Sequence, residues 1–200
     1  MHSALTQFRQ NLEWVRELGA LAAAVESMTT PAIDVSDMLR AQVVLAVSAV
    51  DHFVHDLSRL GMIEIAQGVR ARTDAYLRFQ MPLTSVESAL RGLPHEMWIG
   101  DTVREKHSWL SFQEPDRIAD AIRLISSVKL WEAVGNELEM PAQDVKTNLR
   151  LIVDRRNKIA HEADMDPANP GFRWPIARGL VDGAIKFIER IGEAIFKVAV

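Results

Sequence analysis

The sequence contains no cysteine. This absence excludes disulfide bonds, metal sites built from thiolates and a cysteine nucleophile, and it is consistent with a reducing compartment. Long hydrophobic runs are missing as well. The longest run, from Ala41 to Val50, includes Gln42 and Ser48 and is about half as long as a membrane-spanning helix requires. We therefore expect no contact with the membrane.

The chain also lacks the signals of several other protein classes. Residues 1–7 show no basic region followed by an apolar core, which is the pattern of a secretory signal, so we expect a cytoplasmic protein. Glycine and proline number 10 and 8 and fall mostly between periodic segments, which excludes a collagen-like or low-complexity chain. There is no glycine-rich phosphate loop and no Gly-x-Ser-x-Gly motif, so two common kinds of catalytic site are excluded.

An excess of basic residues is likewise absent, because the net charge is −4. The overall charge argues against binding to nucleic acid. Local clustering matters more than the total, however, when the ligand is a short strand. One basic cluster argues for binding to RNA. It contains a single acid, Asp154, and five basic residues: Lys146, Arg150, Arg155, Arg156 and Lys158.

Apolar residues recur every three or four positions along most of the chain, and no segment shows sustained period-two alternation. This pattern predicts an all-α fold. The chain has 200 residues, 48% of them hydrophobic, and no internal repeat or linker, which fits a single helical domain over residues 1–200. The expected helices cover about 5–27, 37–60, 84–92, 94–109, 115–138, 141–163 and 175 onward.

Local signals place several helix ends. Gly61 is expected to interrupt or end the second helix, and Pro115 to begin a later one. Thr84 and Glu87 have the spacing of a capping box, with the short helix stopping at Gly92. The last helix is expected to open at Pro175, with a buried face made of Ile176, Leu180, Ile185, Ile188, Ile191 and Ile195.

Residues 68–113 have a choppier pattern than the rest. We expect them to form an extra helical insertion in the middle third of the domain. A lid over a functional site, a partner-binding surface and simple bulk are all compatible with this segment.

The chemistry-bearing groups gather on the helix expected at 141–163, as Arg156-Asn157-x-x-x-His161. A guanidinium can neutralise a phosphate, an amide can orient it, and an imidazole transfers protons near neutral pH. At 100° per residue the three groups share one side of the helix, with the small Ala160 between them. Alternatively, Arg156 lies near the apolar stripe of the helix and would pair with a core acid.

Arg156 and His161 are ~7.5 Å apart along the helix axis. That separation is too large for one helix to hold a single phosphate oxygen from both ends. Two copies packed antiparallel across a twofold axis would bring each His161 near the other copy's Arg156, and Ala160 would permit their close approach. We therefore expect a homodimer with a composite site at its interface.

The Arg156-Asn157-x-x-x-His161 segment resembles the Arg-polar-x(3 or more)-His signature of HEPN domains. These are all-α proteins, many of them metal-independent endoribonucleases of bacterial toxin–antitoxin and antiviral systems. Residues 41–54, 129–135 and 149–157 also resemble that family, most closely its RiboL-PSP-HEPN-like branch. The resemblance covers roughly 37–67 and 115–200, whereas residues 68–113 match no known pattern.

The resemblance implies a HEPN-like helical bundle and a role for each motif residue. Arg156 would bind the scissile phosphate, Asn157 would position it, and His161 would be the acid–base. Asp51 occupies the place of a family acid near the motif arginine, although the family more often has Glu there. The adjacent Arg155 and Lys158 would support the site.

The implied reaction needs neither cofactor nor metal. The 2′-hydroxyl of RNA attacks the phosphorus, which yields a 2′,3′-cyclic phosphate and a 5′-hydroxyl, so DNA should not be cut. An antitoxin or another defence protein would be a partner. Some HEPN toxins carry a tyrosine two residues after the histidine, which a partner nucleotidyltransferase modifies. In this sequence that position is Ala163, so we do not expect neutralisation by modification of a tyrosine there.

Two other groups of side chains have weaker functional patterns. Trp174 and Arg173 lie in a Pro/Gly-rich loop just after the motif helix and are candidates for contact with unpaired bases, whereas the other tryptophans fit core or interface anchors. His52 and His55 are flanked by carboxylates, but no second cluster completes a metal site. Polar residues on a half-buried helix explain that pair better.

We thus expect a dimeric, metal-independent HEPN endoribonuclease. One alternative is a non-catalytic HEPN module that binds RNA or a partner protein. Another is a structural helical subunit of a larger assembly, which would have Arg156 buried and salt-bridged.

Overall fold

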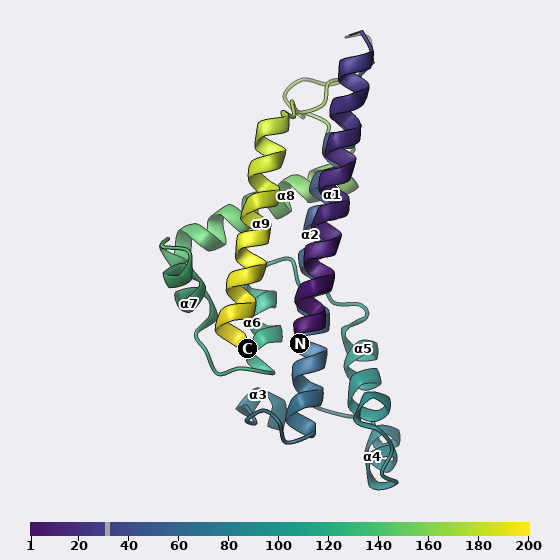
Figure 1. Ribbon diagram of the computed structural model, residues 1–200, viewed down its shortest axis with the longest axis vertical. Helices are drawn as coiled ribbons and strands as arrows, with labels where there is room; N and C mark the ends of the chain where they lie inside the picture. Colours follow the sequence, from purple (N-terminus) through teal and green to yellow (C-terminus); the bar gives the residue numbers. More distant parts are fainter. Residues whose placement is uncertain (31–32) are drawn as a thin grey trace.

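The computed structural model describes residues 1–30 and 33–200, in which all regular secondary structure is helical apart from one isolated β-bridge between Met165 and Arg173 (Figure 1). The predicted all-α fold is confirmed. Among the helices described, none combines the length and the hydropathy that crossing a membrane requires. In chain order the elements are α1 (His2–Met28), α2 (Ser36–Ala66), α3 (Asp74–Leu77), α4 (Leu83–Leu90), a π-helical turn η1 (Glu96–Gly100), α5 (Asp101–His107), α6 (Pro115–Arg123), α7 (Leu130–Glu137), α8 (Ala142–His161) and α9 (Arg178–Ala199).

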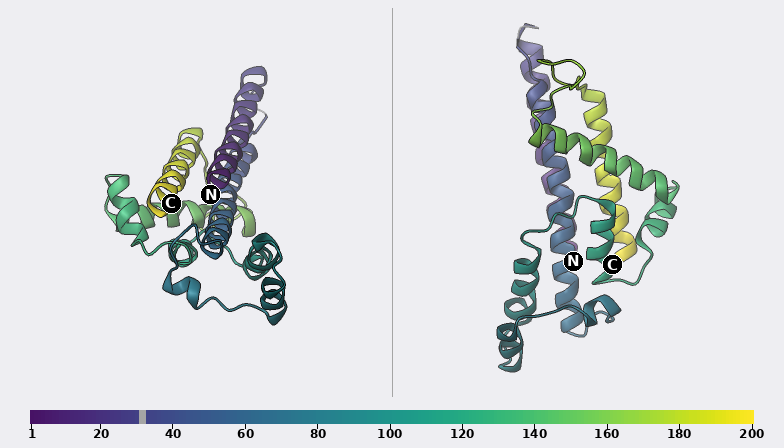
Figure 2. Two further views of the ribbon diagram at one scale, coloured as in Figure 1. Left: turned by 60° about the horizontal axis from the view of Figure 1, so that its bottom comes forward. Right: turned by 180° about the vertical axis from the view of Figure 1, so that it is seen from behind.

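Three long helices, α1, α2 and α9, run side by side, and α8 runs across them (Figure 2, right). Each long helix buries one apolar stripe, as the three- and four-residue spacing predicts. Phe8 of α1 packs on Phe53 of α2 with ring centroids 4.9 Å apart, and Ile188 of α9 is fully buried in the same core. The core therefore joins sequence segments from both ends of the chain.

Helix α2 does not end at Gly61, contrary to the sequence-based expectation, but continues to Ala66. The glycine is buried inside the helix, where an added Cβ would lie 2.6 Å from Cγ2 of Ile125. Gly61 therefore lets Ile125, just after the end of α6, pack directly on the backbone of α2. Close packing, not helix termination, explains this glycine.

Two other expectations about helix ends are wrong. Pro82, not Thr84, is the N-cap of α4, and no side chain caps that helix, so the Thr84–Glu87 pair is not a capping box. Helix α9 begins at Arg178 instead of Pro175, and Leu180 is 74% exposed. The later isoleucines of α9 are buried as expected, and Pro115 begins α6.

The segment 68–113 is helical and packs along α2 through η1 and α5 (Figure 1). Its end is fastened to the middle of α2, where the Asp51 carboxylate accepts hydrogen bonds from the Phe112 backbone N–H (2.6 Å) and the Gln113 side-chain amide (3.1 Å). His107 is buried beside this point, 6% exposed. It packs against Phe112, Phe79 and His55 with ring centroids 5.1, 6.4 and 6.1 Å apart.

Burial and, to a smaller extent, the nearby His55 together lower the pKa of His107 to about 4. An unfolded histidine has a pKa near 6.5, so the unfolded chain binds a proton that the folded chain excludes. The contribution of the neutral, buried His107 to the free energy of unfolding is complete above pH 6.5. It is lost as the pH falls toward 4. We expect urea unfolding to show a loss of about 2 kcal/mol between pH 7.5 and pH 5 that His107→Phe lacks. Equal pH dependence in the two proteins would show that His107 titrates normally.

Candidate functional site

Helix α8 positions the basic cluster by burying one face and leaving the rest accessible. Val145, Leu149 and Val153 are spaced four residues apart and are buried, so this stripe fixes the rotation of the helix against the core. Lys158 and His161 lie in the last turn, where basic groups interact favourably with the helix dipole.

Arg156 and Asn157 lie at a surface pocket of about 440 Å³. Arg156 is half-buried, and its Nη1 donates to Oδ1 of Asn157 at 3.1 Å. Its Nε is buried without a hydrogen-bond partner. The other lining residues come from α8 and from the segment that ends α5 and begins α6: Trp109, Leu110, Ser111, Gln113, Glu114, Arg117 and Val153.

No acid in the described ranges forms an ion pair with Arg156. A purely structural role predicts the opposite, a buried and salt-bridged arginine. The guanidinium is instead oriented by the Asn157 carbonyl and retains donors for an anion. The Asn157 NH₂ group remains able to donate to a second acceptor.

His161 is exposed at the last position of α8 and does not line this pocket. A single chain therefore brings Arg156 and Asn157 together but leaves the imidazole outside their pocket. This placement follows from the helix itself, since Arg156 and His161 are five positions apart, which is ~7.5 Å along the axis.

Asp51 is connected to the pocket indirectly. Its carboxylate binds the Phe112 N–H and the Gln113 amide, and Nε2 of His55 lies 3.7 Å from its Oδ1. In the described part of the chain it forms no ion pair with Arg156. Gln113 lines the Arg156 pocket, so Asp51 supports the pocket by holding its wall.

Arg155 faces away from the pocket and belongs to a buried ion cluster. Its Nη2 lies 2.8 Å from Oδ2 of Asp164, and the same oxygen accepts from Nε of Arg40 at 2.7 Å. The carbonyl of Trp174 accepts from both arginines, at 3.3 and 3.0 Å. Arg155 therefore fixes the loop that follows α8 instead of supporting a phosphate site directly.

The side chains expected to contact unpaired bases are engaged with the protein. Arg173 forms an ion pair with Asp37. Trp174 is half-buried, and Nζ of Lys158 lies 5.4 Å from the centre of its ring, which is the geometry of a cation–π contact. These contacts hold the loop after α8 against α2 and the end of α8.

Three aromatic or charged residues of the pocket were not indicated by the sequence. Trp109 was expected to be a core or interface anchor, but it is 80% exposed next to Arg156. Arg117 adds a second exposed cation. Burial and Asp154 raise the pKa of Glu114, against the lowering effect of Arg150. No motif links these residues to Arg156, because only the packing of α6 against α8 brings them together.

Neither histidine of α2 is part of a metal site in the described residues. Nε2 of His52 lies 4.0 Å from Oδ2 of Asp56, one turn away, and His55 is paired in the same way with Asp51. No group of three or more potential metal ligands occurs within 1–30 and 33–200. These pairs are contacts along one helix.

Comparison with known proteins finds no matching family model, no similar curated protein and no similar solved structure. The resemblance to HEPN domains therefore rests on the motif and on the three segments quoted from the sequence.

Proposed function

We propose that this protein is a HEPN-type endoribonuclease that cleaves RNA without a metal ion, in a toxin–antitoxin or antiviral defence setting. The observation that carries the proposal is the Arg156 guanidinium, which lies at an open pocket without an ion pair in the described residues and is oriented by a hydrogen bond to Asn157. Its remaining terminal N–H groups are able to donate to a phosphate oxygen.

The reaction uses a nucleophile that the substrate supplies. The 2′-hydroxyl loses its proton and attacks the adjacent phosphorus, while the bond from phosphorus to the 5′-oxygen breaks and that oxygen gains a proton. Arg156 and Asn157 stabilise the charge on the phosphoryl oxygens, and His161 assists proton transfer. The 2′-hydroxyl is held next to the phosphorus by the ribose, so part of the required proximity is built into the substrate.

A second copy of the chain would complete the site. The Arg156 pocket of one chain contains no imidazole, whereas His161 and Ala160 are exposed on α8. An antiparallel pair of α8 helices with its twofold axis between positions 158 and 159 would place His161 of the partner subunit beside Arg156. The exposed Ala160 allows the close approach that this arrangement needs.

The proposal is tested with end-labelled single-stranded RNA and purified protein in excess EDTA. We expect cleavage to a 2′,3′-cyclic phosphate and a 5′-hydroxyl. A 2′-O-methyl RNA of the same sequence is the matched control and should remain intact, because its nucleophile is blocked.

Cleavage of the 2′-O-methyl strand, or a requirement for added metal, would contradict the mechanism. Binding of both strands without any cleavage would instead identify a non-catalytic RNA-binding module. The exposed Trp109 at the Arg156 pocket suits that alternative, since bases stack on aromatic rings.

A further inference from the structure

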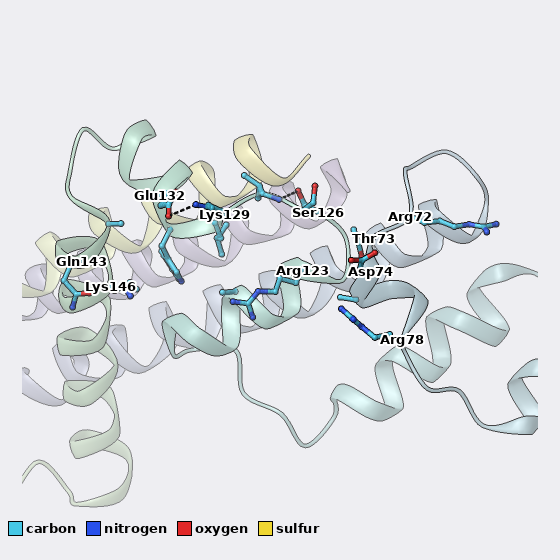
Figure 3. A pocket seen from close by; sticks show the side chains of 17 residues that line it. Arg72, Thr73, Asp74, Arg78, Arg123, Ser126, Lys129, Glu132, Gln143 and Lys146 are labelled. Carbon is cyan, nitrogen blue, oxygen red and sulfur yellow. Dashed lines mark hydrogen bonds and ion pairs between the residues drawn. The ribbon is translucent and has the colours of Figure 1, made fainter.

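A second and larger cavity, of about 870 Å³, lies between α3, α6 and the first turns of α7 and α8. Figure 3 shows it as elongated, with Gln143 and Lys146 of α8 at one end, Thr73, Asp74 and Arg78 near α3 at the other, and Arg123 between them. It shares no lining residue with the Arg156 pocket.

The cavity has an excess of positive charge in a chain whose net charge is −4. Two carboxylates line it, Asp74 and Glu132. The basic residues that line it are Arg72, Arg78, Arg123, Lys129 and Lys146. A concave surface with charge of one sign concentrates ligands of the opposite sign.

Some of these cations are already neutralised. Arg123 pairs with Asp120, and Nζ of Lys129 lies 3.4 Å from Oε1 of Glu132 (Figure 3). Arg78 and Lys146 form no ion pair within residues 1–30 and 33–200, and they lie toward opposite ends of the cavity. A ligand that satisfies both must therefore carry negative charge at more than one point.

The floor of the cavity is apolar. Leu130 and Trp131 are buried there, and Nε1 of Trp131 donates to the Pro115 carbonyl at 2.9 Å, which fixes the indole. Ser126, Ser127 and Thr73 add hydroxyl groups to the wall. The volume lies within the ~300–1,000 Å³ typical of small-molecule sites, which combine apolar walls with a few placed polar groups.

We propose that this cavity binds a small ligand that carries two or more linked phosphate groups, such as a nucleoside diphosphate or triphosphate. The apolar floor covers the base or ribose, and the cations contact the phosphates. Arginine binds phosphate oxygens through its planar fork and lysine through its point charge, so linked phosphates satisfy Arg78 and Lys146 better than a single carboxylate does. This site is independent of the proposed ribonuclease activity.

The test is titration calorimetry with ATP as the probe in EDTA, with inorganic tripolyphosphate as competitor. We expect saturable binding that weakens with salt, and a loss of at least about tenfold in affinity in the Arg78→Ala/Lys146→Ala double variant, because two charge-assisted contacts are removed. The matched control is Arg91→Ala/Lys186→Ala, which likewise removes one arginine and one lysine, both exposed and both outside the cavity. Its affinity should equal that of the wild type.

Circular dichroism and thermal unfolding verify that both double variants are folded. Because Arg78 contacts the phosphates in this proposal, Arg78→Lys in place of Arg78→Ala should restore part of the affinity for ATP. Absence of saturable ATP binding to the wild type would overturn the proposal, and so would equal affinity in the two double variants. Binding of a short RNA strand that depends on Arg78 and Lys146, without binding of ATP, would overturn it in favour of a strand groove.

Discussion

His161→Ala is expected to slow RNA cleavage by about 10²–10⁴-fold, the usual contribution of acid–base catalysis, while RNA binding changes little. His161 is exposed at the end of α8, so removal of its ring leaves no cavity in the core. Arg156→Ala should reduce cleavage and also weaken binding, because it removes the cation that we propose binds the phosphate. Single-turnover rates with end-labelled RNA, together with binding measured on 2′-O-methyl RNA, separate the two effects.

The same two variants test whether the site is composite. In a mixed dimer of Arg156→Ala and His161→Ala chains, a composite arrangement leaves one site with both residues intact and the other with neither. Random exchange of subunits should therefore restore about a quarter of the wild-type rate from two inactive proteins.

Lack of restoration, with mixed dimers verified by mass spectrometry, would show that each chain uses its own Arg156 and His161. His161→Ala with the wild-type rate would refute the assigned role of the histidine altogether. Arg117→Ala is an informative comparison, because it removes a cation from the same pocket without touching the motif.

Arg40→Ala is expected to destabilise the fold by up to about 3–5 kcal/mol, since removal of one of two cationic partners leaves the buried Asp164 carboxylate only partly compensated. The Asp164 side chain is fully buried, and its Oδ1 already lacks a hydrogen bond. Among residues 1–30 and 33–200, Arg155 is the one cation that would remain paired with it, at 2.8 Å. Urea unfolding followed by circular dichroism measures the loss. Arg123→Ala breaks an exposed pair with Asp120 and should cost no more than about 1 kcal/mol.

Combining Arg40→Ala with Asp164→Asn should cost less than the sum of the two single changes, because the buried charge is then absent. Additive effects would mean that the two side chains do not interact in solution. In either case the loop after α8 is the segment that changes. Two of its residues, Ala163 and Asp164, have φ angles of 51° and 58°, a conformation that residues other than glycine hold only when neighbouring contacts enforce it.

The spacing of apolar residues was sufficient to predict the long helices α1, α2, α8 and α9, but it merged α6 and α7 into one helix over 115–138 and missed the short α3. Two sequence-based expectations were wrong: that Gly61 interrupts or ends α2, and that Leu180 is buried. Gly61 serves a contact with Ile125, which is distant in sequence. Leu180 keeps the periodic position but is exposed, since only one side of the first turn of α9 meets the core.

The candidate site could be predicted only in part. Arg156, Asn157 and His161 lie on one helix, so a local motif indicates them together. Trp109 and Arg117 reach the pocket through packing between α6 and α8, which no local pattern encodes. Arg155 was assigned to the site because it adjoins Arg156, but its direction is set by Asp164, which the backbone turn after α8 places beneath it.

The bond between Asp51 and the Phe112 amide also determines where the chain tolerates changes in length. Gly92, whose φ of 73° marks the turn after α4, lies far along the segment from that anchor, so extra residues there lengthen an exposed turn. An extra residue between His107 and Phe112 would instead move Gln113, and with it one wall of the Arg156 pocket. Natural relatives of this chain should therefore vary in length near position 92 and keep a constant spacing from His107 to Gln113.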